Sequence, residues 1–352
     1  YVLMQHLACA AYEAPLRPED QELFTLPADR GMGERSYVDA MVELEESGQL
    51  EYRDDRWVYA VRHPAGRHPA AQRYPAQGVG LRSAGSKRVV IVDTSQEDRV
   101  LEEIDATTAY TRAHPGAIYL HQGASYLVSA LDLRDGVALA EPVDASYYTQ
   151  PRQIDDMHII QSVRHRQLSS CAAFFGRVRV TSQVIGYSRK KAFSDEVLSQ
   201  EPLDLQPQVF ETMGVWWGVS TTLGNDILRR GKDLLGGLHA VEHACIGMLP
   251  LLAMCDRLDL GGVSTAHHAD TEGALICVYD AYPGGVGLAE RGLEVLEEWW
   301  RTTLEAIRTC PCEAGCPSCI HSPKCGNNNE PLDKEAAVML LSGLLADTKR
   351  AT

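Results

Sequence analysis

The spacing of apolar positions near the start of the chain predicts helices followed by a small hairpin. The run LMQHLACAAYEAPL has a helical period, and so does RSYVDAMVELEESGQL, in which Tyr37, Met41 and Leu44 are four and three residues apart. Gly48 follows the second run and is a helix stop signal. LEYRDDRWVYAV then indicates two short strands around an Asp-Asp turn. Helices followed by a hairpin are typical of a winged-helix module, which we expect over residues 1–62.

The rest of the chain changes from a strand pattern to a helix pattern. KRVVIVDT, AIYLHQGASYLVSALDL and GVALAEPV are rich in β-branched and aromatic residues and predict strands between 79 and about 190. From about 208, LLGGLHAVEHACIGMLPLLAM and GLAERGLEVLEEWWRTTLEAIRT predict long helices, and ALICVYD predicts a buried strand. DKEAAVMLLSGLLAD predicts a closing helix with Asp333 as its N-cap. We therefore expect an α+β or mixed α/β fold, with an irregular crossover at 63–78 and a mixed α/β domain over 79–352.

Composition places this chain among ordinary globular proteins. It has 352 residues, of which 45% are apolar and 23% charged, enough to bury a core in two or three domains. We see no window near 18 uncharged apolar residues, so we expect no transmembrane helix and no membrane partner. The apolar start at Tyr1, with no basic leader, suggests a fragment of a longer cytoplasmic protein.

The charge is strongly acidic, with a formal net charge of −15. This charge disfavours a protein that binds nucleic acid non-specifically, because such binding usually depends on a basic surface. Residues 1–60 contain 13 acidic and 5 basic side chains, which favours a protein-packing role for the winged helix over a DNA-binding role.

Basic residues concentrate only between 161 and 200. This stretch contains seven basic and two acidic side chains. Arg177 and Arg179 are two residues apart on a predicted strand, so their side chains point to the same face of the sheet. A solvated sheet face is the simpler interpretation, and a nucleic-acid groove is the alternative. The candidate DNA contacts are Arg164, Arg166, Arg177, Arg179, Arg189 and Lys190.

Half of the ten cysteines lie in the short segment CPCEAGCPSCIHSPKC, residues 310–325. Thiolates are preferred ligands of structural Zn²⁺, and the C-x2-C turn of Cys316 and Cys319 places two sulfurs on one ion. Cys312 and Cys325 complete four ligands, and Cys310 is an alternate for Cys312. His321 is a further nitrogen candidate. The pattern predicts one closed, structural zinc site.

Two further patterns carry a functional alternative. His239, Glu242 and His243 match the H-x-x-E-H motif of inverted zinc proteases, which would make the chain a zinc metallohydrolase. The apolar neighbours favour two hydrogen-bonded core histidines instead. Gly284, Gly285 and Gly287 lie between a strand and a helix, where a tight turn is the simpler interpretation and a phosphate contact the alternative.

Several segments resemble one known family. CPCEAGCPSCIHSPKCGNNNEPLDK is similar to the signature of the MZB domain, the zinc-binding C-terminal region of MrfA (YprA-like) superfamily-2 DNA helicases. GLHAVEHACIGMLP, DLGGVS, VYDAYPGGVGLAERG and EPVDASYYTQPR also resemble that family. The resemblance implies zinc ligands at Cys312, Cys316, Cys319 and Cys325, with Cys310 as the alternate.

The resemblance also implies a function. The family couples two RecA-like ATPase lobes to this region, moves 3′ to 5′ on single-stranded DNA and serves DNA repair. No P-loop and no Asp-Glu box occur in this sequence, so ATP and Mg²⁺ would act only in motor lobes outside it. We expect a non-catalytic accessory region, cytoplasmic and associated with the bacterial nucleoid. Its partners would be single-stranded or forked DNA and the helicase lobes. A pure protein-interaction scaffold is the other alternative.

In the accessory hypothesis, exposed aromatics could also stack on bases. Trp216 and Trp217 are the candidates, with core packing as the simpler interpretation.

Overall fold

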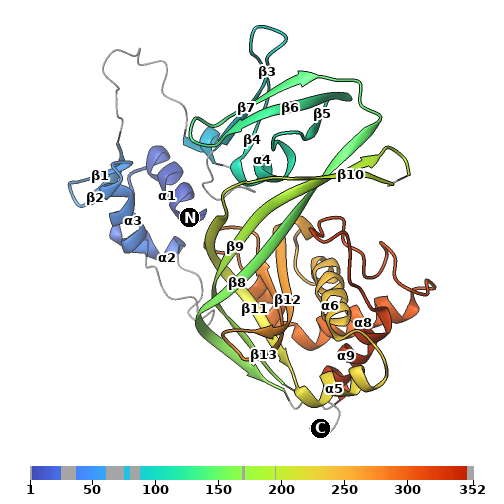
Figure 1. The fold of residues 1–352 in the computed structure, drawn as a ribbon. Helices are drawn as coiled ribbons and strands as arrows, with labels where there is room; N and C mark the ends of the chain where they lie inside the picture. The colour runs from blue at the N-terminus through green and yellow to red at the C-terminus, as the bar shows by residue number, and fades with distance from the viewer. Residues whose placement is uncertain are drawn as a thin grey trace. The chain divides into compact units, whose positions relative to one another are not determined.

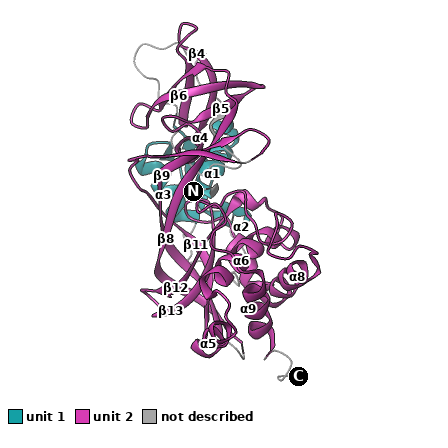
Figure 2. Cartoon of the chain, turned by 45° about the vertical axis from the view of Figure 1, so that its right-hand side comes forward, with its two compact units in different colours: residues 1–85 teal, residues 86–352 magenta. Residues whose placement is uncertain are grey.

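A computed structural model describes residues 2–24, 37–60, 75–79, 88–168, 171–194 and 196–346. The chain divides into two compact units, residues 1–85 and 86–352 (Figure 2). Most of the predicted crossover at 63–78 lies outside the described residues, apart from a short 3-10 helix, η4 (Pro75–Gly78). The predicted boundaries at 62 and 78 therefore stay predictions.

The first unit has the helices and hairpin expected of a winged helix. It contains α1 (Val2–Glu13), η1 (Pro18–Asp20), α2 (Gln21–Phe24), α3 (Tyr37–Glu46), β1 (Leu50–Arg53) and β2 (Arg56–Tyr59). Leu7, Met41 and Leu44 are fully buried in its core. Leu16 and Trp57 exchange backbone hydrogen bonds of 2.9 and 2.8 Å and so form an isolated antiparallel bridge beside the hairpin. The predicted helices, hairpin and Asp-Asp turn are confirmed.

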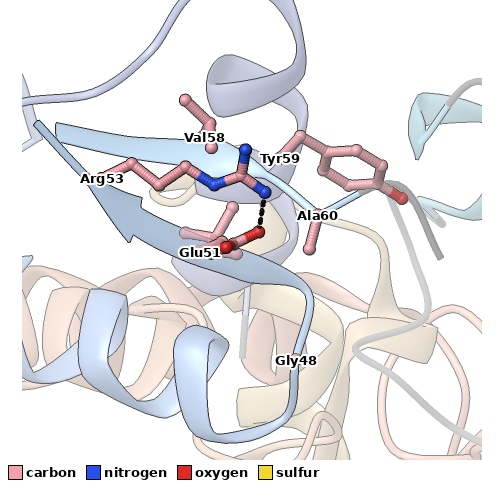
Figure 3. A pocket seen from close by; sticks show the side chains of 7 residues that line it. Gly48, Glu51, Arg53, Val58, Tyr59 and Ala60 are labelled. Atoms are coloured by element: carbon pink, nitrogen blue, oxygen red, sulfur yellow. Dashed lines mark hydrogen bonds and ion pairs between the residues drawn. The ribbon is translucent and has the colours of Figure 1, made fainter.

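A shallow hollow lies beside this hairpin (Figure 3). Gly48, Val58, Tyr59 and Ala60 line it. Glu51 and Arg53, both on β1, also line it and form an ion pair with each other. Both charged side chains are exposed, so the pair contributes little to stability. The hollow has no cluster of catalytic groups.

The second unit begins with a small sheet of strand order β4-β3-β7-β6-β5. Its strands are β3 (Arg88–Asp93), β4 (Arg99–Asp105), β5 (Ile118–His121), β6 (Ala124–Asp132) and β7 (Val137–Pro142). The pairs are antiparallel except β3 with β7. Helix α4 (Ala106–Arg112) contributes Ala109 to a core that includes Ile91 and Val128.

Two very long strands lead from this sheet to the rest of the unit. β8 (Tyr147–Gln167) pairs with β9 (Ala172–Lys191) over nearly its whole length, with three register shifts (Figure 1). β9 also belongs to an antiparallel sheet of order β10-β9-β11-β13-β12. The other strands are β10 (Val197–Pro202), β11 (Gln208–Val219), β12 (Leu260–His268) and β13 (Gly273–Asp280).

Helices pack on the part of this sheet that is formed by β11, β13 and β12 (Figure 1). They are α5 (Thr221–Arg229), α6 (Leu234–Met248), α7 (Leu288–Glu294), α8 (Leu296–Thr309) and α9 (Lys334–Ala346), with short 3-10 turns η5 (Leu249–Leu251) and η6 (Arg257–Asp259). α6 packs on β12 and β13 and against α8 and α9. Asp333 Oδ1 accepts a 2.9 Å hydrogen bond from Ala336 N, which confirms the predicted N-cap of α9.

The α6 region bears on the expectation of no transmembrane helix. Residues Leu234–Leu251 are long and apolar enough to cross a membrane by length and composition, although the stretch contains Glu242 and is therefore not an uncharged window. However, 61% of this stretch is buried inside the protein. A core helix that is covered on several sides becomes apolar all round, and the same property marks a membrane span.

Candidate metal centre

Four cysteine sulfurs converge in the loop after α8. The Sγ atoms of Cys310, Cys312, Cys316 and Cys319 all lie within 4.8 Å of one another. Individual separations are 3.4 Å for Cys310–Cys316, 3.5 Å for Cys312–Cys319, 3.6 Å for Cys310–Cys312 and 3.8 Å for Cys316–Cys319. A tetrahedral ion with about 2.3 Å bonds to sulfur separates its ligands by about 3.8 Å. The group therefore fits one metal ion with four thiolate ligands.

Local backbone structure holds these sulfurs together. α8 ends at Thr309, so Cys310 leaves the helix as its C-cap in an extended conformation. Cys319 N donates to Cys316 O at 3.0 Å, and Cys316 N lies 3.3 Å from Cys319 Sγ. This closes the C-x2-C turn that the sequence indicated.

Lys334, the first residue of α9, supplies positive charge to the group. Its Nζ donates to Cys310 O at 2.8 Å and Cys312 O at 2.6 Å, and lies 3.3 Å from Cys312 Sγ. Desolvation alone would raise the pKa of Cys312. Hydrogen bonds from Cys319, Cys310 and Lys334 outweigh it and lower that pKa to about 6. Cys312 is thus ready to serve as a thiolate. Nothing in the sequence analysis singled out Lys334.

Cys325, predicted as a zinc ligand, lies outside this group. Its Sγ is 3.5 Å from Nε2 of His239 on α6, and His243 joins the same second cluster. Cys310 takes the fourth place among the thiols instead. The sequence contains five cysteines in this segment for the four ligand positions of one metal ion. Cys325 contacts α6, which precedes it by more than 80 residues, so only the folded structure shows that it lies apart from the other four.

The H-x-x-E-H motif lies on α6, with Glu242 and His243 buried and His239 half-buried. The Nδ1 atoms of His239 and His243 each lie 2.9 Å from a backbone carbonyl. Glu242 Oε2 accepts a 2.5 Å hydrogen bond from Ser264 Oγ on β12. Burial raises the pKa of Glu242 to about 7. The carboxylate is thus engaged by the sheet rather than placed as a base for hydrolysis.

The glycine-rich turn before α7 is filled by the protein's own carboxylate. Asp280, the last residue of β13, accepts backbone hydrogen bonds from residues 286–289 at 2.5 to 3.3 Å. An external phosphate would need these same N–H groups. A strand-end aspartate before a glycine turn is the sequence signal for this arrangement.

Three of the six predicted DNA contacts are engaged in ion pairs. The pairs are Arg164–Glu290 at 3.0 Å, Arg166–Glu297 at 2.6 Å and Arg179–Glu211 at 2.8 Å. The Arg189 guanidinium lies over the rings of Tyr147 and Tyr187, 5.6 and 5.9 Å from their centroids. Across the described part of the chain, no ion pair involves Arg177, which is exposed on β9, or Lys190, which is half-buried.

Both candidate stacking tryptophans are core residues. Trp216 is 3% exposed and Trp217 is fully buried, packed edge-on against Trp299 and Trp300 of α8. The core interpretation of these residues is confirmed.

Comparison with known proteins gives the same two modules. Residues 241–320 match the family model of the MrfA Zn-binding domain, MZB. Residues 1–84 match the model of the winged helix domain of the ATP-dependent helicase HRQ1. The chain is 32% identical over 323 residues to the uncharacterized ATP-dependent helicase YprA of Bacillus subtilis (strain 168), covering 91% of this chain and 40% of that protein. The chain corresponds to the C-terminal region of the MrfA/YprA-like helicases.

Two more relatives define which part of these helicases it resembles. The chain is 25% identical over 368 residues to the ATP-dependent helicase HRQ1 of Saccharomyces cerevisiae, covering 99% of this chain and 32% of that protein. It also matches the crystal structure of the DUF1998 helicase MrfA bound to DNA, with a TM-score of 0.53, 28% identity, and coverage of 97% of this chain and 42% of that one. The chain thus spans about a third to two fifths of these relatives, as the C-terminal region of MrfA/YprA-like helicases.

The match to the MZB family model also bears on the thiol group. The MZB model is named for zinc binding, and its match ends at residue 320, one residue past the last of the four clustered cysteines. The family model and the geometry of the Cys310–Cys319 group together suggest zinc.

Proposed function

We propose that this chain is the accessory region of an ATP-dependent 3′–5′ DNA helicase that acts in DNA repair. The supporting observation is the fold shared over 97% of the chain with an MrfA structure bound to DNA. In the whole protein, RecA-like lobes would bind ATP and Mg²⁺, and this region would contribute DNA contacts and a structural metal site. The whole protein would act in the cytoplasm, at the nucleoid.

The structural metal in this proposal is one Zn²⁺ held by Cys310, Cys312, Cys316 and Cys319. Four thiolates close a tetrahedral site and leave no position for a substrate, which favours a structural role. The bound metal would fix the loop between α8 and α9, two helices that pack on each other. Its binding free energy would thereby stabilise the fold.

Arg177 is the best-placed DNA contact among the six sequence candidates. It is exposed on β9, its strand neighbours are Gln161 and Met213, and no described carboxylate pairs with it. A free guanidinium is available for charge-assisted hydrogen bonds to phosphate. Single-stranded or forked DNA is the proposed partner.

The test is binding of fluorescent single-stranded DNA at several salt concentrations, with the 352-residue chain and with the whole helicase. Replacing a phosphate-contacting Arg reduces the slope of log affinity against log salt by about 1. We expect Arg177→Ala to do so and to weaken binding several-fold. Arg301→Ala is the matched control, because Arg301 pairs with Glu297 on α8. No binding at low salt, or equal losses in both variants, would refute the DNA-contact proposal.

A further inference from the structure

A second group of metal-ligating side chains lies outside the four-thiol centre. We infer that His239, His243 and Cys325 form a second metal site, which takes Zn²⁺ through two imidazole nitrogens and one thiolate. The ligand atoms of these residues all lie within 4.8 Å of one another. His239 Nε2 is 3.5 Å from Cys325 Sγ. Tetrahedral Zn²⁺, with bonds of about 2.0 Å to nitrogen and 2.3 Å to sulfur, separates such a pair by about 3.5 Å.

Both imidazoles are already oriented as metal ligands. His239 Nδ1 lies 2.9 Å from Pro331 O, and His243 Nδ1 lies 2.9 Å from Ile320 O. A carbonyl oxygen only accepts, so Nδ1 carries the proton in each ring and Nε2 keeps its lone pair. Metal-binding histidines almost always have their second nitrogen fixed in this way.

The three side chains gather where little solvent reaches them. The two histidines are i and i+4 on α6, and their ring centroids are 4.2 Å apart. The ligand atom of each lies within 4.8 Å of the Cys325 sulfur. His243 and Cys325 are buried and His239 is half-buried. A cation between the three ligand atoms can therefore bind all of them at once.

The second site is distinct from the first but close to it along the chain. Ile320, whose carbonyl orients His243, directly follows Cys319 of the four-thiol group. Asn329 N donates to Cys325 Sγ at 3.2 Å and holds the thiol near α6. The segment 310–331 therefore supplies parts of two sites, of which the second links it to α6.

Three protein ligands leave the fourth tetrahedral position to solvent. Glu242 is hydrogen-bonded to Ser264 and packs over Gly262. The proposed role of these three ligands is therefore metal binding, not hydrolysis.

The test is the zinc content and the Co²⁺ spectrum of the purified chain. We expect two equivalents of Zn²⁺ in the wild type, one in Cys325→Ser and one in His243→Ala. Cys312→Ser should lose the other equivalent. His267→Ala and Cys255→Ser are matched controls, because these residues lie outside both groups, and they should keep two.

Titration of the metal-free wild type with Co²⁺ needs no variant that could fail to fold. We expect two saturating phases: one with the strong charge-transfer absorption of four thiolates, and one with about a quarter of that intensity. A single phase and one equivalent of zinc, unchanged in Cys325→Ser, would overturn the second site while leaving the four-thiol site intact. Loss of all zinc in Cys312→Ser would also overturn it.

Discussion

At the scale of single residues, one lysine contacts the four-thiol group directly. Lys334 bonds the carbonyls of Cys310 and Cys312 and approaches the sulfur of Cys312, so it both shapes the loop and neutralises thiolate charge. Groups that orient metal ligands in this way typically contribute 10- to 100-fold, as an order of magnitude, to metal affinity.

We expect Lys334→Met to weaken zinc binding at the four-thiol site by about 10-fold, because it removes both carbonyl contacts and the nearby positive charge. Competition with a chromophoric chelator measures this. Lys232→Met is the control, since Lys232 is half-buried and pairs with Glu335 away from the thiols. Equal affinities of the two variants would show that Lys334 does not support the site.

The thiol group was predictable from sequence because its ligands lie within ten residues of one another. Cys316 and Cys319 were identified by the geometry of a short turn alone. The sequence analysis took Cys325 as a ligand and Cys310 as an alternate for Cys312. That the group contains both Cys310 and Cys312 and leaves Cys325 beside α6 was not predictable, since it depends on a helix from a distant part of the chain. Lys334 was missed for the same reason: its distance from Cys312 is set by how α9 packs on α8.

At the scale of elements, the β8–β9 pair depends on one small residue. A Cβ on Gly176 would lie 2.0 Å from Gln161 O, a backbone atom of the partner strand. A Cβ on Gly218 of β11 would have its nearest neighbour 3.7 Å away, at ordinary contact distance.

We expect Gly176→Ala to lower the free energy of unfolding by about 3 kcal/mol or more, because the strands must separate to admit the methyl group. Gly218→Ala should change it by less than about 1 kcal/mol. Urea unfolding followed by far-UV circular dichroism compares the two. Similar midpoints and slopes for both variants would contradict the expected clash.

Sequence patterns predicted the helices better than the strands. The amphipathic and apolar runs of α3, α6, α8 and α9 were sufficient, and Asp333 marked where α9 begins. The segment CAAFFGRVRVTSQVIGYS, whose pattern alone predicts either a pair of strands or one bent strand, is most of the single strand β9. β12 was not predicted, because LGGVSTAHH has two glycines and no clear alternation; its pairing with β13 makes it a strand.

At the scale of the whole molecule, the metal groups belong to one unit only. Both lie in residues 86–352, whereas the core of residues 1–85 consists of apolar side chains such as Leu7, Met41 and Trp57.

Removing the metal should therefore destabilise the two units unequally. With a strong chelator, we expect faster amide hydrogen exchange in α6, α8, α9 and residues 310–331, because the metal no longer closes these segments together. Exchange in α1 and α3 should be unchanged. Mass-spectrometric exchange on the whole chain measures both at once. Equal acceleration in both units would contradict this assignment.

The two-part organisation was visible in the sequence because the winged-helix pattern is local and complete by residue 60. How the long strands combine two sheets was not, since it rests on pairings between segments far apart in the chain.

The paired strands β8 and β9 connect the five-stranded sheet to helix α8. Thr149, near the start of β8, accepts a hydrogen bond from Ile118 N in the five-stranded sheet, and Arg166, near its end, pairs with Glu297 of α8. At about 3.3 Å per residue, these anchors are roughly 55 Å apart along the strand. Hydrogen bonds join the two strands along this length, so a displacement of the five-stranded sheet would be transmitted along them as one body. It would then reach α8, which leads into the cysteine loop at Cys310.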